Sequence, residues 1–457
     1  MENKIATRVN LKRRGVVVEN LVCGLCGKVE ESSSHLFSVC KFIWQSNYDT
    51  ASLGFLFKKT SRKLDAQTVT PPYIYSHTFH LSFAKHLIII SLIIISFCFP
   101  DRSMEMEAKT KPWLVLSLFL LAANCMQQCV HGKPRVSCLF IFGDSFSDNG
   151  NNNNRDTNAK SNYSPYGIDF SRGPTGRFTN GQTEADITAA RLGFRDSIPP
   201  YANTSGSDIM EGVNYASAAS GIRPETGSQR GDIISLEEQI QNHRDIYNRV
   251  VKKLGGSNKA KKYLSKCLYY MRTGTNDYYG NYFLPQVFST SRDFTTDQYA
   301  QDLVRRYSRY LKTLHDKYGA RKFLVFDLGR IGCTPYARAT YARSRRCAEE
   351  VNDAALTFDR NLKSELERLN TNNLSADAKF MFVNTTTKLD TDPTSLGFTV
   401  VDTPCCPTQL NLSCIENGRP CRNRDQYVHW DGIHQTQAAN EITADTTTDA
   451  INCLLIS

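Results

Sequence analysis

The sequence predicts an α/β protein in which helices cover both faces of a parallel β-sheet. Three observations support this fold class: short apolar runs, long amphipathic segments between them, and polar or glycine-containing turns where the runs end. Strands that alternate with helices favour a parallel sheet buried on both sides. The 457 residues are enough for one large α/β domain with a complete core.

The expected strands are short and the expected helices are long. The strands are the apolar runs Cys138–Phe142, Leu268–Met271, Phe323–Leu328 and Phe380–Val383. The helices are the amphipathic stretches Leu236–Leu254, Thr296–Tyr318 and Ala348–Leu369, of which the second has apolar residues at helical spacing. Functional sites in parallel sheets lie at the carboxyl ends of the strands, so the site is expected there.

Composition and charge point to a globular protein without an obvious polyanionic partner. Hydrophobic residues make up 40% and charged residues 22% of the chain, which excludes disordered, collagen-like and multi-span membrane classes. The net charge is +10, but residues 1–132 hold 15 Lys and Arg against 9 Asp and Glu and so carry +6 of it. The +4 spread over the rest implies no nucleic-acid partner.

Cysteine usage and glycosylation signals indicate an exported protein. Nine of the fifteen cysteines follow residue 132, and four of these cluster in a Pro-, Asn- and Gly-rich stretch typical of disulfide-stapled loops: Cys405, Cys406, Cys414 and Cys421. Cys333 and Cys347 are a further candidate pair, and the odd number leaves one thiol over. Asn-x-Ser/Thr acceptors occur at Asn162, Asn203, Asn373, Asn384 and Asn411. We therefore expect a secreted, extracellular, disulfide-bonded glycoprotein.

Residues 104–132 have the layout of a secretory signal peptide. A Met and two Lys precede an apolar run from Trp113 to Ala123, and small and polar residues follow it. Because this segment lies inside the chain, we infer that translation starts at Met104 or Met106. The alternative is that this run and Leu87–Phe99 are buried elements, since both are too short to span a bilayer stably.

The first 45 residues carry a possible zinc site. Cys23, Cys26, His35 and Cys40 have plausible spacing for a tetrahedral zinc ion, which thiolates and imidazole suit. The stretch resembles the zinc-binding module of plant reverse-transcriptase-like proteins. A reduced zinc knuckle and an exported disulfide-bonded domain need opposite redox compartments, so we favour a gene-model fusion over a bifunctional protein. Residues 46–103 show no usable motif.

A serine follows the first expected strand, and a histidine with a nearby acid stands near the C-terminus. Gly143, Asp144 and Ser145 come directly after the apolar run, which exposes the serine at the strand end. A serine hydroxyl becomes nucleophilic when a base removes its proton and a further group orients that base. Asp431 and His434 are three residues apart, a spacing at which the carboxylate can reach the imidazole. These three residues predict a catalytic triad.

Donors for an oxyanion are also present. Asn276 lies in the short segment that follows the second expected strand, and its side-chain amide is one candidate donor. The backbone of Gly221, where the missing Cβ allows close approach of a substrate, and the N–H of Ser145 are the others.

Four sequence blocks resemble the plant GDSL esterase/lipase family, a branch of the SGNH hydrolases. They are FGDSFSDNGNN, GVNYASAASGI, GTNDY and WDGIH, in the family's order and spacing, and PTGRFTNG and IGCTP are similar as well. The resemblance covers about Arg135 to Cys453 and implies a flavodoxin-like three-layer α/β/α sandwich over residues 133–457. It also implies Ser145 as nucleophile, His434 as base, Asp431 as its orienter, and Gly221 and Asn276 in the oxyanion hole.

Some residues depart from the family pattern or have competing interpretations. Ala218 and Ala219 stand where many members have a Gly pair, which weakens the assignment of Gly221. His429 is the alternative base, but it lacks the spacing to an acid that His434 has. Asp144, Asp148 and Asp277 are more readily explained as partners of backbone N–H groups.

The hypothesis is hydrolysis of a carboxylic ester through an acyl-enzyme, without a cofactor or metal in the hydrolase domain. The substrate would be a small-molecule, lipid or polymer ester. A catalytically silent binding protein on the same scaffold, an acyltransferase, and a zinc-dependent nucleic-acid-binding protein built on residues 1–45 are the alternatives. No stable membrane span is expected.

Overall fold

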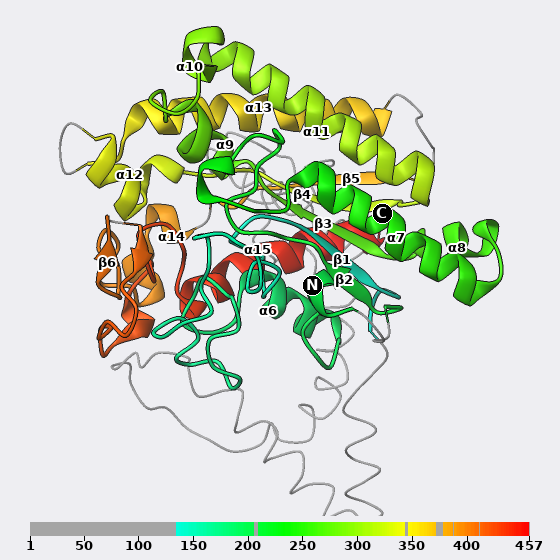
Figure 1. Cartoon of the computed structure of the whole chain (residues 1–457), viewed down its shortest axis with the longest axis horizontal. Helices are drawn as coiled ribbons and strands as arrows, with labels where there is room; N and C mark the ends of the chain where they lie inside the picture. Colours follow the sequence, from blue (N-terminus) through cyan, green and yellow to red (C-terminus); the bar gives the residue numbers. More distant parts are fainter. Residues whose placement is uncertain are drawn as a thin grey trace, which may run out of the picture. The chain divides into compact units, whose positions relative to one another are not determined.

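A five-stranded parallel sheet forms the centre of the protein (Figure 1). The structure, a computed structural model, describes residues 134–204, 209–342, 346–371, 378–386, 388–410 and 412–456. The strand order is β2-β1-β3-β4-β5, and every neighbouring pair is parallel. The strands are β1 (Leu139–Gly143), β2 (Gly212–Asn214), β3 (Leu268–Arg272), β4 (Lys322–Phe326) and β5 (Lys379–Val383).

Helices cover both faces of the sheet, as Figure 1 shows for α11 and α13 on one face and α15 and α6 on the other. Side chains alternate along a strand, so β1 sends Phe140 and Phe142 into one core and Leu139 and Ile141 into the other. The first core packs against α7 (Leu236–Leu254), α8 (Ser257–Leu264), α11 (Thr296–Tyr318) and α13 (Glu349–Thr371). The second packs against α6 (Glu184–Leu192) and α15 (Gln437–Ile456). The expected three-layer α/β/α arrangement is confirmed.

The long helices begin and end where local signals place them. Ser235 and Thr295 form capping boxes at the starts of α7 and α11, and Gly255 and Gly319 end these helices in the left-handed conformation. The predicted bounds of both helices are therefore confirmed. The third predicted helix agrees with α13 to within two residues, and four predicted strands agree with β1, β3, β4 and β5 to within two residues.

Short elements occupy the loops at the carboxyl edge of the sheet. They include α9 (Thr275–Asp277), the π-helix η5 (Tyr278–Tyr282), η6 (Ile331–Cys333), α12 (Pro335–Thr340), α14 (Lys388–Thr391), and a hairpin of β6 (Thr408–Gln409) and β7 (Ser413–Cys414). The remaining short elements are α10 (Thr290–Asp293), η3 (Tyr201–Asn203), η4 (Ser228–Arg230), η7 (Pro393–Leu396) and η8 (Arg424–Gln426). Single π-helical turns are frequent at functional sites.

Four disulfides join the described cysteines. The expected staples are present as Cys405–Cys421, Cys406–Cys414 and Cys333–Cys347. A fourth, Cys138–Cys267, joins the segments that lead into β1 and β3 and was not expected. Cys453 is the ninth cysteine and belongs to none of these disulfides, in agreement with the odd count.

Several predictions concern residues outside the described ranges. The zinc ligands Cys23, Cys26, His35 and Cys40, the unassigned residues 46–103 and the signal-like segment 104–132 all precede residue 134. Within the described ranges, no helix is long and apolar enough to cross a membrane.

Candidate active site

Ser145 lies in a tight turn directly after β1. The turn needs glycine at position 143, because a Cβ there would lie 2.2 Å from the backbone oxygen of Arg272 in the neighbouring strand β3. Asp144 Oδ1 accepts a hydrogen bond from the backbone N–H of Phe146 at 3.1 Å. The turn places Ser145 at the carboxyl edge of the sheet, where 8% of the residue is exposed.

Two buried carboxylates hold the loops around the serine. Asp148 accepts backbone hydrogen bonds from Gly150 and Asn151 in its own loop, and from Ala218 in the loop after β2 at 2.9 Å. Burial raises the pKa of Asp144 and of Asp148 to about 6. The expectation that both side chains serve backbone N–H groups is confirmed.

His434 lies between the serine and an acid. Its Nε2 is 2.7 Å from Ser145 Oγ, and its Nδ1 is 2.8 Å from Asp431 Oδ2. The histidine and the aspartate belong to one turn that precedes α15, the last helix in the chain, while the serine directly follows β1, the first strand. The structure thus brings together the three residues that the sequence predicted as a triad, at hydrogen-bonding distances.

Asp431 is fully buried and saturated with donors. Its Oδ1 accepts from the backbone N–H groups of Ile433 and His434, and its Oδ2 accepts from Tyr166 Oη at 2.6 Å. Burial on its own would raise the pKa of Asp431, but the His434 imidazole and these hydrogen bonds outweigh it and lower the pKa below its ordinary value. An ionised Asp431 fixes the tautomer of His434 that leaves Nε2 free to accept the serine proton.

The disulfide-stapled loop supports the turn that holds Asp431. Backbone N–H groups of Cys405 and Cys406 donate to the carbonyl oxygens of His429 and Trp430, each at 3.0 Å. The backbone N–H of Cys414 donates to the hydroxyl of Tyr166, the residue that contacts Asp431. The loop that these two disulfides cross-link is therefore connected to Asp431 by one or two hydrogen bonds.

Two aromatic rings pack against the imidazole of His434. Phe146 makes an edge contact at 5.3 Å between ring centroids, and Phe178 lies at 4.9 Å. His429 has a different environment and does not line the pocket that contains Ser145. Burial lowers the pKa of His429 to about 4, so this ring is neutral near pH 7.

The candidate oxyanion donors do not all lie where expected. Asn276 lines the same pocket as Ser145, and its Nδ2 donates one hydrogen bond to the oxygen of Ser220 at 3.0 Å. Ala219 also lines this pocket, with a positive φ of 67°. Gly221 is not among the lining residues, and a Cβ there would lie 2.6 Å from a carboxylate oxygen of Asp277.

That carboxylate has a structural role. Asp277 accepts hydrogen bonds from the backbone N–H groups of Ile222 and Arg223 and from the hydroxyl of Thr226. The glycine at position 221 is therefore required for close packing against this buried acid.

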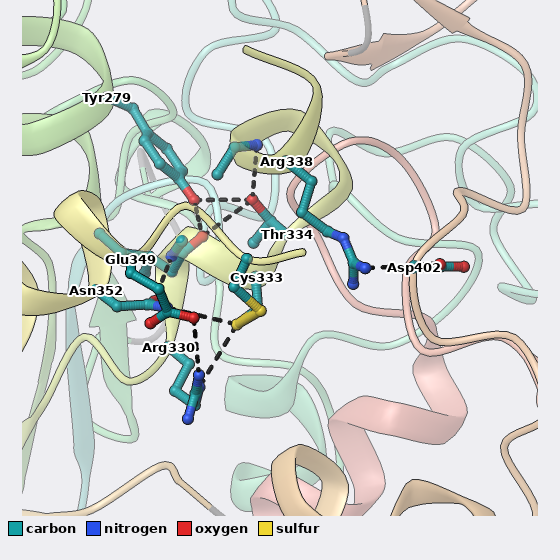
Figure 2. Close-up of a disulfide and its surroundings, with 12 residues drawn as sticks. Tyr279, Arg330, Cys333, Thr334, Arg338, Glu349, Asn352 and Asp402 are labelled. Atoms are coloured by element: carbon teal, nitrogen blue, oxygen red, sulfur yellow. Dashed lines mark hydrogen bonds and ion pairs between the residues drawn. A yellow bond between two sulfur atoms is a disulfide. The ribbon is translucent and has the colours of Figure 1, made fainter. Parts of the chain in front are cut away.

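The pocket around the serine has a volume of about 260 Å³. Its apolar wall includes Phe178, Tyr279, Leu284, Tyr336, Leu412 and Ile433. Tyr279 comes from the π-helix η5, and its hydroxyl contacts the oxygen of Ile331 and Thr334 Oγ1 (Figure 2). We call this cavity the catalytic pocket.

Tyr166 and Phe178 are site residues that the sequence analysis did not single out, and Ala219 was noted there only as a departure from the family pattern. Phe178 lies in the PTGRFTNG block and Ala219 in the GVNYASAASGI block, so both could have been suspected from these blocks. No signal in the sequence connects Tyr166 with Asp431, 265 residues away. Among the described residues there is no group of three or more His, Cys, Asp or Glu that could hold a metal ion.

The fold and the Ser145–His434–Asp431 contacts define an α/β/α hydrolase domain of the SGNH type. The model of the family described as GDSL-like Lipase/Acylhydrolase matches residues 139–447. The chain therefore belongs to this family, and it is a carboxylic ester hydrolase.

Similar plant proteins cover the same part of the chain. GDSL esterase/lipase At1g29670 of Arabidopsis thaliana is 45% identical over 345 residues, which is 74% of this chain and 94% of that protein. At1g29660 and At5g45670, two more GDSL esterase/lipases of Arabidopsis thaliana, are 43% and 44% identical. The first of these alignments covers 74% of this chain and 94% of the relative, and the second covers 71% and 91%.

Proposed function

We propose that the protein hydrolyses carboxylic esters in two steps through an acyl-enzyme on Ser145. The observation that carries this proposal is the 2.7 Å contact between His434 Nε2 and Ser145 Oγ, with the imidazole held on its other side by Asp431. His434 takes the serine proton while Oγ attacks the ester carbonyl, and then gives this proton to the departing alcohol. Water, deprotonated by the same histidine, releases the acid and restores the serine.

The oxyanion of each tetrahedral intermediate would be bound by three donors. One is the second N–H of the Asn276 amide, and the others are the backbone N–H groups of Ser145 and Ala219. Neither backbone group donates to another described residue. Ala219 replaces Gly221 in this role because it lines the catalytic pocket. Since nucleophile, base and donors all come from the chain, the reaction needs no metal or cofactor.

The size of the catalytic pocket favours an ester substrate with a compact group at the reacting carbonyl. Its volume of about 260 Å³ is slightly below the usual range for sites that enclose drug-sized ligands. Tyr279 and Tyr336 belong to the apolar wall of the pocket. This wall would contact the apolar part of the substrate. Short acyl esters should therefore be turned over more readily than long ones.

We also propose that the mature protein is secreted and consists of residues from about 133 to 457. The signal-like segment 104–132 would be removed, and the stretch before it would belong to a wrongly fused gene model. The four disulfides support an oxidising compartment. Three of the sequon asparagines, Asn162, Asn203 and Asn384, are exposed and accessible to glycosylation.

The test is turnover of p-nitrophenyl acetate by protein expressed from Met106 through a secretory pathway. Ser145→Ala should abolish turnover, because it removes the nucleophile. Ser147→Ala is a matched control in the same turn, since its buried Oγ makes no hydrogen bond, and it should stay active. Full activity of Ser145→Ala would overturn the proposal.

Two further outcomes separate the alternatives. If the folded, secreted parent is inert on both short and long acyl chains, a silent binding protein replaces the hydrolase. If added alcohol diverts most of the acyl group from the free acid to a new ester, the protein acts chiefly as a transferase.

A further inference from the structure

Arg230, the last residue of η4, brings a positive charge to the catalytic pocket. Among the described residues that line this pocket it is the only Lys or Arg, and none of them is an Asp or a Glu. Asp431, the acid of the triad, does not line the pocket either. The chemical steps proposed above make no use of this charge, because the nucleophile, the base and the oxyanion donors are other residues.

The guanidinium of Arg230 has no partner in the described part of the chain. Its backbone N–H and carbonyl oxygen form hydrogen bonds, but its side chain forms neither a hydrogen bond nor an ion pair with another described residue. Arg223, from the same loop, instead binds the carboxylates of Glu225 and Asp302. Arg230 is also partly buried. Because a partly buried charge without a partner costs free energy, an anionic ligand would be favoured beside it.

Asn158 supplies a second unused donor next to Arg230. Its backbone N–H donates to the carbonyl oxygen of Arg230 at 2.9 Å, and the hydroxyl of Thr157 donates to the same oxygen at 2.7 Å. Asn158 and Arg230 therefore lie side by side, and both line the catalytic pocket. The side-chain amide of Asn158 makes no hydrogen bond to another described residue. A guanidinium and an amide together offer the N–H donors that a carboxylate accepts.

The size and the charge of the pocket limit what this pair of residues can bind. Ser145 and Arg230 line the same cavity of about 260 Å³, so an anionic group at Arg230 is separated from the reacting carbonyl by only a few bonds. One guanidinium balances one negative charge, and the oxyanion of the intermediate has its own donors. A substrate with a single negative charge therefore suits the pocket better than one with two.

We infer that the substrate is an ester that also carries a carboxylate, a few bonds from the carbonyl that Ser145 attacks. Arg230 is the specificity-determining residue, because its guanidinium binds this carboxylate together with the amide of Asn158. The inference rests on the proposed function and narrows its substrate class. The carboxylate is held equally in the bound substrate and in the transition state, so this interaction acts chiefly on KM.

The test compares two pairs of esters that differ only in a terminal methyl or carboxylate group. Monoethyl succinate and ethyl butyrate place this group on the acyl side, and 3-acetoxypropanoate and propyl acetate place it on the alcohol side. In at least one pair, the charged ester should have a kcat/KM about tenfold or more higher, because a hydrogen bond to a charged group is worth about that factor. Acid release by the secreted protein in a pH-stat measures turnover.

Variants locate the source of this preference. Arg230→Gln should reduce it about tenfold or more, and Arg230→Lys should retain part of it, because lysine keeps the charge but not the paired donors. Asn158→Ala, a change at an exposed residue, should reduce it several-fold and gives an independent test of the same subsite. Arg244→Gln is the matched control, since Arg244 is exposed on α7 and does not line the pocket, and the preference should stay unchanged. Thermal unfolding shows that each variant is folded.

Binding to the inert Ser145→Ala variant, measured by isothermal titration calorimetry, examines recognition without turnover. The charged ester of the preferred pair should bind more tightly than its neutral counterpart. Ser145-dependent turnover with no preference for the charged ester in either pair, or with an undiminished preference in Arg230→Gln, overturns the inference and leaves the proposed function intact. If the secreted protein turns over none of the four esters and Ser145→Ala binds the charged ones no more tightly, both the proposed function and the inference are overturned.

Discussion

The ring of Phe146 packs edge-on against the imidazole of His434, with 5.3 Å between the ring centroids. The guanidinium of Arg272, at the end of β3, lies 4.5 Å from the centroid of the same phenyl ring. Arg272 is in turn 3.7 Å from the buried carboxylate of Glu184 on α6. The orientation of the proposed base therefore depends on packing that extends from the helix layer through the strand end to the imidazole.

Phe146→Leu should lower kcat with little change in KM. The smaller side chain leaves the imidazole freer to rotate, and a small misplacement of a catalytic group costs up to about 10²-fold in rate. We expect a loss of about tenfold for p-nitrophenyl acetate, with thermal unfolding changed by only a few degrees. An unchanged kcat would mean that hydrogen bonds alone hold His434 in place.

Tyr166→Phe should move the acid limb of the pH–rate profile to higher pH. The hydroxyl of Tyr166 donates to Asp431 Oδ2 and helps to lower the pKa of that carboxyl. Without this donor the pKa of Asp431 rises, so Asp431 becomes protonated at a higher pH as the solution is acidified. The measurement is kcat/KM from pH 4 to 8. Tyr247→Phe is a control outside the site, because the Tyr247 hydroxyl contacts Ser257 Oγ and no residue of the triad.

The sequence predicted the central sheet and three long helices because their apolar patterns and capping residues are local signals. It missed α15, in which Thr443 and Thr447 are buried, because threonine is a poor helix former and the helix forms through tertiary packing. It also missed β2, a three-residue strand at the edge of the sheet. Pattern analysis cannot detect an element this short.

The three predicted triad residues were found from local motifs, but their surroundings depend on distant parts of the chain. Tyr166 reaches Asp431 across 265 positions, and the loop stapled by Cys405–Cys421 supports the same turn through the backbone. The identity of the backbone oxyanion donor could not be predicted from the sequence either. Only the three-dimensional structure shows that Ala219 lines the catalytic pocket while Gly221 packs against Asp277.

Asp277→Asn should flatten the pH dependence of stability. Burial raises the pKa of Asp277 from 3.8 to about 7, so the folded protein holds this proton more tightly than the unfolded chain. The resulting stabilisation is complete below about pH 4 and is lost as the pH rises through 7, a change of about 4 kcal/mol. Urea unfolding at pH 4 to 8 measures it. Asp353→Asn, at an exposed position on α13, should leave the slope unchanged.

Removal of the Cys333–Cys347 disulfide should weaken substrate binding as well as stability. The bond brackets α12, whose Tyr336 lines the catalytic pocket and donates its backbone N–H to Gly432 at 2.8 Å. Cross-links over loops of this size stabilise proteins by about 3 kcal/mol. Replacing both cysteines by Ser should lower the free energy of unfolding by about that amount and raise KM several-fold. Equal KM values for the parent and the double serine variant would show that α12 holds its position without the cross-link.

Ala219→Gly should stabilise the protein and keep or increase its activity. Ala219 has a φ of 67°, a left-handed conformation that costs an L-residue about 1–2 kcal/mol and costs glycine almost nothing. Glycine retains the backbone N–H that we propose as an oxyanion donor, so the donor set is unchanged. Ala219→Val, which is β-branched, should destabilise the protein by more than 1 kcal/mol and reduce kcat, because the strained turn would shift this N–H away from the intermediate. Denaturant unfolding and ester kinetics on the three proteins test both effects, and a valine variant as active as the parent would remove Ala219 from the oxyanion hole.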